Sequence, residues 1–202
     1  MKNWILIFTL CMTSFSLFGQ KQETLFGKSR VVGGFGGPIV EYNFANDNTM
    51  VSVGGGGAVI IGDFFIGGYG MGSTSSSWIN DVNNDPFKID LGHGGFWIGG
   101  TYPSHKLIHF FSSAKIGWGA VNMRFYDDNF VVDDNVFVLE PEAGIELNIF
   151  RWFRIAATAH YRWVDGIDPS LSGINRNYYN GFGANLTFRF GGFGNNWQNW
   201  DD

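Results

Sequence analysis

Strict alternation of apolar and charged side chains is the feature that most limits what this chain can fold into. It is clearest in residues 136–150, where the odd positions from Phe137 to Ile149 are apolar and the even positions carry three glutamates. A period of two places successive side chains on opposite faces of a β-strand. The segment is therefore predicted to be a strand with one apolar and one charged face. The three glutamates are Glu140, Glu142 and Glu146.

Segments of this kind recur through the chain and are long enough to cross a bilayer as tilted strands, which takes about 9–11 residues. The connections between them mostly alternate between long polar loops and short turns, as in bacterial outer-membrane barrels. Aromatic residues gather at the strand ends, where they suit a membrane interface. The eight predicted strands are 30–44, 49–61, 64–74, 87–102, 107–123, 136–150, 153–164 and 178–190.

The final strand ends in "LTFRF" at Phe190, and with the eight segments it resembles the small outer-membrane barrels of the OmpA and OmpX type. The resemblance covers residues 30–190 and implies an all-β, eight-stranded antiparallel up-and-down transmembrane β-barrel with both termini periplasmic. "VVGGFGGPIVEY" and "VSVGGGGAVIIG" also resemble uncharacterised glycine-rich barrel proteins, which implies a location but no activity. The family's last strand normally closes the chain, whereas here a tail follows it.

The chain divides into four parts. Residues 1–19 are predicted to be a secretory signal peptide, because Lys2 precedes an apolar stretch and then small residues. Residues 20–29 form a short periplasmic segment, 30–190 the barrel and 191–202 a periplasmic tail. Cys11 leaves with the signal peptide, so the mature chain has no thiol for a disulfide or metal site. A net charge of -5 argues against nucleic acid as a partner.

If the apolar faces meet lipid, the charged faces meet inside the barrel and need partners. A turn with an odd number of residues between the sixth and seventh strands places their charged faces on the same side of the sheet. A turn at 150–152 sets Glu140 opposite Arg162 and Glu142 opposite His160, whereas a turn at 151–153 sets Glu142 opposite Arg162. Glu41 is a further candidate member. The predicted lumen ion network is Glu140, Glu142, Glu146, Arg154, His160, Arg162, Lys115 and Arg189.

An eight-stranded barrel is just filled by its own side chains. The sequence therefore predicts a closed, non-enzymatic barrel that serves as a structural or accessory subunit of an envelope complex, without cofactor or metal. Two alternatives stay open: a barrel that binds or modifies lipid, and a secreted soluble barrel that binds a small apolar ligand. Ser112 and Ser113 near His109 are the residues that a lipid-modifying activity would use.

Acidic loops offer a second kind of candidate site, since oxygen-rich clusters suit divalent cations. "DVNND" from Asp81 resembles a calcium loop but lacks its glycine and its closing glutamate, so solvated loops are the simpler interpretation. The four histidines show no metal-ligand spacing. The acidic loop residues are Asp81, Asp85, Asp127, Asp128, Asp133, Asp134, Asp165 and Asp168.

Glycine is concentrated in the first half of the chain, and Gly55, Gly57 and Gly70 are expected to face lipid. Small residues allow close contact between membrane elements, so this band is a candidate docking surface for another membrane protein or an acyl chain. The change of apolar parity in the fourth strand predicts a bulge at 92–95. Trp197 and Trp200 in the tail are candidates for contact with a periplasmic partner.

Overall fold

The computed structural model describes residues 31–45, 48–74, 76–79, 86–125, 131–167 and 179–194. The predicted signal peptide, the 20–29 segment, Trp197 and Trp200 lie outside these residues. No helix in the described part of the chain is long and apolar enough to cross a membrane. The strands are β1 (Val31–Ala45), β2 (Asn48–Ile61), β3 (Phe64–Thr74), β4 (Ser76–Ile79), β5 (Pro86–Tyr102), β6 (Ile108–Phe125), β7 (Val131–Phe150), β8 (Phe153–Asp165) and β9 (Gly181–Phe193).

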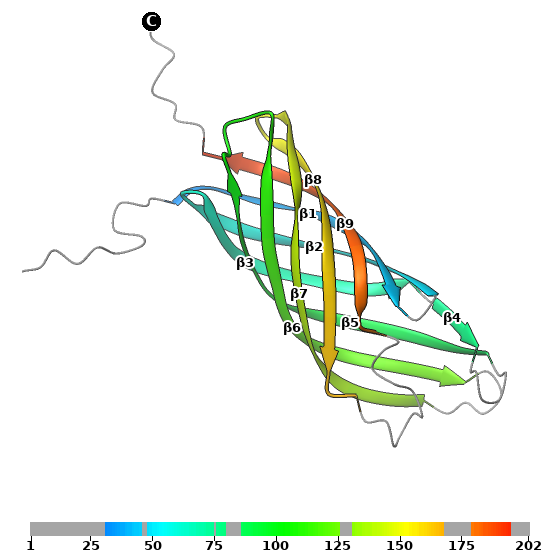
Figure 1. The fold of residues 1–202 in the computed structure, drawn as a ribbon. Helices are drawn as coiled ribbons and strands as arrows, with labels where there is room; N and C mark the ends of the chain where they lie inside the picture. Colours follow the sequence, from blue (N-terminus) through cyan, green and yellow to red (C-terminus); the bar gives the residue numbers. More distant parts are fainter. Residues whose placement is uncertain are drawn as a thin grey trace, which may run out of the picture.

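The strands form one closed antiparallel sheet in which chain neighbours are also neighbours in space (Figure 1). β9 pairs with β1, and β3 pairs with β5, so the sheet has no open side along the wall. β3 and β4 pair with successive parts of β5 and together make one wall strand. The predicted all-β, eight-stranded antiparallel barrel, the architecture of small outer-membrane barrels, is confirmed.

The two ends of the barrel differ. One end, which we call the turn end, carries the short connections at 62–63, 103–107 and 151–152, together with the first residue of β1 and the last residue of β9. The opposite end is the loop end. There β4, β5, β6 and β7 project beyond the other strands (Figure 1). The strand ends that the long connections join therefore all lie at this end.

Several predicted details differ from the structure, among them the start of β7 at Val131 rather than near 136 and the presence of β4 within a predicted loop. β9 runs to Phe193 rather than ending near 190, because its last residues pair with Gly33 and Gly34 of β1. The bulge predicted at 92–95 is wrong, since β5 pairs regularly with β6 along its whole length. The apolar parity changes because Leu91 points inward into an apolar cluster. A one-residue shift lies instead on the neighbouring wall strand, between Gly72 and Ser76.

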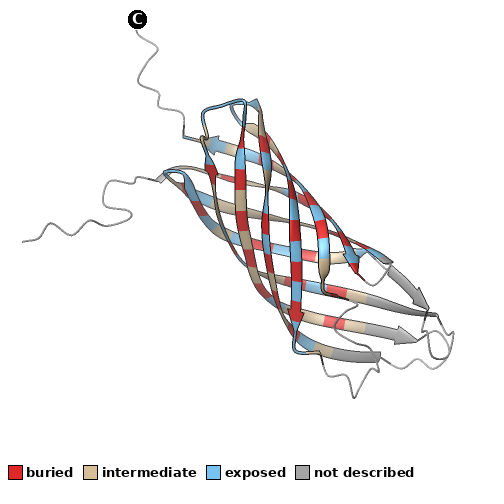
Figure 2. Cartoon of the chain, in the orientation of Figure 1, coloured by how far each residue is buried: buried red, intermediate tan, exposed pale blue. Residues whose placement is uncertain are grey.

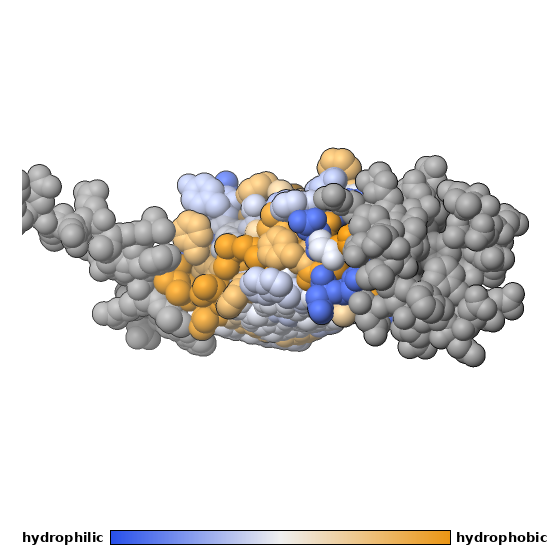
Figure 3. Space-filling model, turned by 90° about the horizontal axis from the view of Figure 1, so that it is seen from below, coloured by the Kyte–Doolittle hydropathy of each residue, from blue (hydrophilic) through white to orange (hydrophobic). Residues whose placement is uncertain are grey.

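Burial alternates along most of the strands, with polar residues inside and apolar residues outside, as in a membrane barrel. On β8 every even position from 154 to 164 is buried and most odd positions are exposed, and the same banding runs around the wall (Figure 2). Charged residues such as Glu140 and Arg162 are fully buried, whereas Phe96 is 59% exposed and Ile145 51% exposed. Apolar side chains cover much of the visible wall (Figure 3).

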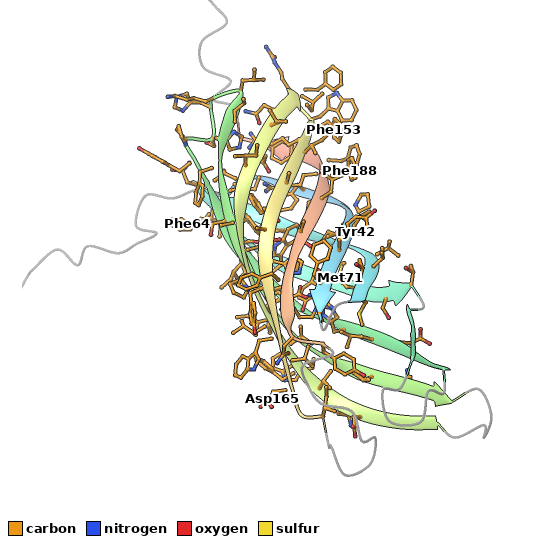
Figure 4. All side chains as sticks on the ribbon, turned by 45° about the vertical axis from the view of Figure 1, so that its right-hand side comes forward. Tyr42, Phe64, Met71, Phe153, Asp165 and Phe188 are labelled. Carbon is orange, nitrogen blue, oxygen red and sulfur yellow. The ribbon has the colours of Figure 1, made fainter. Side chains whose placement is uncertain are left out.

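Exposed aromatic residues form two belts, one toward each end of the wall. Figure 4 shows Phe153 and Phe188 side by side near the turn end and Tyr42 farther along the wall. Aromatic belts of this kind mark the two interfaces of a membrane barrel. Toward the turn end the exposed aromatic residues are Phe64, Tyr102, Phe110, Phe150, Trp152 and Phe190. Toward the loop end they are Tyr42, Phe44, Trp118, Tyr161, Trp163 and Phe182.

Candidate functional site: an ion-paired lumen closed at both ends

In the part of the chain that the structure describes, the lumen holds equal numbers of buried carboxylates and buried Lys or Arg side chains. The inward parity of the strands brings these groups together, because each wall strand contributes every second residue. Pairing is required, since an isolated charge taken out of water costs several kcal/mol or more. The carboxylates are Glu41, Glu140, Glu142 and Glu146, and the cations are Lys115, Arg154, Arg162 and Arg189.

The central layer is organised around Arg162 and Lys115. Arg162 donates from Nε to Glu140 Oε1 over 2.6 Å and pairs through Nη2 with Glu41. Lys115 Nζ lies 3.4 Å from Glu140, 3.5 Å from Glu41 and 3.7 Å from Glu142. Each cation therefore bridges carboxylates from different strands, which ties opposite sides of the wall together.

The register between β7 and β8 is the first of the two that the sequence allows. Glu142 pairs with His160 across the ladder. The turn itself has two residues, Arg151 and Trp152, and an irregularity between Asn148 and Phe150 supplies the extra residue. A two-residue turn with one bulged residue thus has the same effect on parity as the predicted three-residue turn.

Glu142 is held by hydroxyl and amide donors as well as by Lys115. Ser113, Thr158 and Asn185 all donate to its carboxylate, the Thr158 bond being 3.0 Å long. Ser113 in turn accepts a hydrogen bond from Trp97 Nε1 over 2.9 Å. These contacts satisfy a buried carboxylate with neutral donors from β6, β8 and β9.

A second layer lies closer to the turn end and surrounds Glu146. Its carboxylate accepts from His109 Nε2 over 2.8 Å, from Arg154 Nη1 over 3.0 Å, and from Arg189. The Arg189 guanidinium lies 3.6 Å from the centre of the Phe35 ring. Three more rings stand within 5.1–5.5 Å of it, a cation–π arrangement that stabilises a buried arginine. These rings belong to Phe65, Phe111 and Phe193.

Apolar side chains fill the lumen at the loop end and also pack among the charged side chains nearer the turn end. Tyr179 belongs to the cluster at the loop end, and burial raises the pKa of its hydroxyl above its usual value, with a further contribution from Asp134. At the turn end the rings of Phe35, Phe65 and Trp97 pack edge to face with centroids 5.2–5.4 Å apart. The loop-end cluster consists of Met50, Leu91, Val121, Val136, Val138, Val164 and Tyr179.

All eight side chains predicted for the ion network lie in the lumen, but they form two groups rather than one. Glu140, Glu142, Lys115 and Arg162 meet with Glu41, whereas Glu146, Arg154 and Arg189 meet with His109. Sequence reasoning missed the role of His109, which its inward parity on the predicted fifth strand could have indicated.

His160 lies beside the central layer without a short contact to a carboxylate. Its Nε2 is 3.9 Å from Glu41 Oε1 and 3.4 Å from Asn43 Nδ2. Ligand atoms of Glu41, Glu140 and His160 lie within 4.8 Å of one another, close enough to share a metal ion. Arg162 already pairs with both carboxylates, so its guanidinium supplies the positive charge that a metal ion would bring.

The residues considered for lipid chemistry are bound to other groups. Ser113 donates to the Glu142 carboxylate, and Ser112 donates to the Glu142 carbonyl over 3.2 Å. His109 contacts Glu146 and the Lys106 carbonyl. The structure thus does not bring either serine hydroxyl to the His109 ring, as a nucleophile and its base would require.

Most of the acidic loop residues lie outside the described part of the chain. These are Asp81, Asp85, Asp127, Asp128 and Asp168. For Asp133 the structure describes the backbone but not the side chain. Asp165 lies at the loop end of β8 (Figure 4), and Asp134 stands on the projecting part of β7.

The glycines considered for docking lie next to one another on the outer wall. Gly55 pairs with Gly70, and Gly57 pairs with Gly68, on adjacent strands β2 and β3. A Cβ atom added at Gly70 or Gly72 would meet no other atom within 4 Å. The wall is therefore recessed here without an internal packing reason at these two positions.

Comparison with known proteins adds a likeness of fold. No protein-family model and no curated protein matches the chain. Among solved structures, the attachment invasion locus protein Ail of Yersinia pestis is 10% identical, with 79% of this chain and 95% of that chain covered at a TM-score of 0.44. A structure of Ail in complex with the heparin analogue sucrose octasulfate is 12% identical, with 79% of this chain and 95% of that chain covered at a TM-score of 0.45. Neisserial surface protein A is 6% identical, with 81% of this chain and 96% of that chain covered at a TM-score of 0.49. The strand pairing of this chain itself shows the closed barrel.

Proposed function

We propose that this chain is an integral barrel of a bacterial outer membrane that does not catalyse a reaction and acts as a structural or accessory subunit of an envelope complex. The observation that carries this proposal is the polarity of the wall. Soluble barrels bury apolar side chains and expose charges, whereas here eight charged side chains are buried and large apolar ones are exposed. Exposed side chains such as Phe96 need hydrocarbon around them.

The direction of insertion follows from the positions of the ends. β1 begins and β9 ends at the turn end, and short turns face the periplasm in barrels of this kind. Both termini are then periplasmic, and the projecting strands and long loops face outward. Outer-membrane lipids are the first partner of the wall.

A non-enzymatic role is favoured over lipid modification by the contacts of the lumen. Ser113 and His109 each contact a different buried carboxylate, and both residues are buried inside the barrel. The wall and the loops are then the surfaces through which the protein acts. The outward glycines on β2 and β3 are the part of the wall that allows a second membrane element to come closest.

Membrane fractionation tests the proposal. The full chain, expressed in a Gram-negative host, is expected to stay in the outer-membrane fraction after extraction with alkaline carbonate and with urea, and to run as a compact band on gels until it is heated. Release into the soluble fraction in folded form would contradict the proposal and would favour the secreted soluble barrel. An altered lipid profile in a deletion strain, restored by the wild type but not by Ser113→Ala, would favour the lipid-modifying alternative.

A further inference from the structure

The layer around Glu146 contains more positive than negative charge. Among the described residues Glu146 is its one buried carboxylate, and it accepts hydrogen bonds from His109, Arg154 and Arg189. All four residues are at most 7% exposed. Two arginines already outnumber the carboxylate, so the charge on His109 decides how large the imbalance is.

Both ring nitrogens of His109 face oxygen atoms that accept hydrogen bonds. Its Nε2 lies 2.8 Å from Glu146 Oε1, and its Nδ1 lies 3.1 Å from the Lys106 carbonyl oxygen. A carbonyl oxygen can only accept, and so can a carboxylate that two arginines hold in its ionised form. Both nitrogens therefore donate, which only the imidazolium form can do. Three positive groups thus surround one negative group.

Among the residues whose side chains the structure describes, no buried group in the lumen cancels this excess. Four buried glutamates balance four buried Lys and Arg side chains, so the proton on His109 leaves one positive charge over. His160 contacts the Asn43 amide nitrogen, a donor, through Nε2, so this nitrogen accepts and the His160 ring is neutral. A proton on His93 would only increase the excess. An uncompensated buried charge is costly, and one monovalent anion would balance it.

A cavity of the right size lies at this layer. It has a volume of ≈ 10 Å³ at the turn end, and Arg154, Arg189, Thr101 and Phe193 are among the residues that line it. A cavity of about 10–15 Å³ holds one water-sized particle. Arg189 is 2% exposed, and its Nε has no hydrogen-bond partner among the described residues.

Phe193 covers this cavity from the turn end. Its ring centre lies 4.0 Å from the Arg154 guanidinium, and it stacks on Phe35 with ring centroids 6.2 Å apart. Asp63 also lines the cavity, but this exposed carboxylate accepts from Ser104 over 3.3 Å. We propose that the cavity binds one monovalent anion of chloride size between Arg154 and Arg189.

Bromide in place of chloride tests the site directly. Crystals of the purified protein, grown in detergent and soaked in sodium bromide, are expected to show an anomalous peak between Arg154 and Arg189. The Tm in chloride is expected to exceed that in gluconate at equal ionic strength, by roughly 2–4 °C once chloride is about five-fold above its Kd. No peak and equal Tm values would show that the cavity holds only water, and would overturn the proposal.

A matched pair of histidine variants tests the charge argument. His109→Gln removes the excess proton and keeps an amide that can donate to Glu146, so the difference in Tm between chloride and gluconate is expected to vanish. His105→Gln makes the same change at an exposed histidine on the connection that precedes β6 and should keep the difference. If the His109→Gln variant also keeps the difference in Tm between chloride and gluconate, the anion does not balance the charge of His109 and the proposal fails. If this variant does not fold, the bromide peak in the wild type still decides.

Discussion

At the scale of single residues, the lumen depends on cations that serve several carboxylates at once. Arg162 is fully buried and contacts Glu41 and Glu140, whose strands lie on different sides of the lumen. Its removal leaves two buried carboxylates with Lys115 as their remaining Lys or Arg partner among the described residues. Breaking one side of a buried ion pair typically costs about 3–5 kcal/mol.

Arg162→Ala is therefore expected to lower the free energy of unfolding by about 3–5 kcal/mol, measured as thermal or urea unfolding in detergent. Arg162→Lys should recover part of the loss, because it restores the charge but not the planar donor geometry. Lys106→Ala, at an exposed position of a turn, is the control and should change little. A Tm for Arg162→Ala equal to that of the wild type would refute the structural role of the network.

At the scale of elements, the last residues of β9 seal the turn end. Gly191 donates its backbone N–H to the Trp152 carbonyl over 2.9 Å, and Phe193 pairs with Gly33 while its ring lies on Arg154. These residues belong to the barrel, although the predicted boundary assigned them to the tail. The barrel thus continues past the aromatic end of the predicted last strand.

Two truncations separate barrel from tail. Deletion of 195–202 leaves every described contact in place and should keep the Tm of the refolded protein. Deletion of 191–202 removes the Phe193 cover and the end of β9, and should destabilise the barrel by roughly 1–3 kcal/mol from lost aromatic and cation–π contacts. Equal stability of the two forms in a side-by-side melt would show that Phe193 contributes nothing.

The glycines of β3 lie on two different faces of the barrel wall. Gly70→Leu adds a side chain to open space on the outer wall, where a surface substitution usually changes stability by less than about 0.5 kcal/mol. Gly67→Leu on the same strand would press its Cβ against the backbone of Gly57 and Ala58 and should prevent folding. For each variant, the fraction of protein that migrates as the compact form on unheated gels measures how much has folded. Misfolding of Gly70→Leu would mean that the outer glycines serve the barrel's curvature.

At the scale of the whole molecule, the order of layers along the axis makes the barrel a closed body. An apolar cluster at the loop end and the aromatic rings around Arg189 fill the lumen together with two charged layers, so ions meet both an apolar barrier and fixed charges. The ion pairs of the lumen are internal to one chain, which suits a barrel that is stable without a partner and presents its wall and its outward strands to others.

A closed lumen is expected to carry no steady current. In planar bilayers the wild-type protein should show no unit conductance steps at salt concentrations at which a porin of larger strand number conducts. Replacement of Val121 and Val138 in the loop-end cluster by glycine should leave the baseline unchanged, because the turn-end rings still block the path. Regular conductance steps from the wild type would contradict the closed barrel.

Local chain geometry explains what the sequence by itself determined. Alternation of side chains is a property of any extended backbone, so the strand positions, the two faces and the inward direction of residues such as Glu142 and Arg162 could be predicted from residue order. The same geometry limited the β7–β8 pairing to two registers, because a shift by one residue would turn every charge toward lipid.

Only the tertiary structure decided which charges meet. The choice between the two registers depended on a bulge near Ile149, and the contact between Glu41 and Arg162 joins residues on strands that are not neighbours in the sheet. The inward position of Leu91, the division of the network into two layers and the enclosure of Arg189 by rings from β1, β3, β6 and β9 likewise depend on closure. Closure of the wall sets which inward side chains face one another across the lumen, and no pattern along a single strand contains that information.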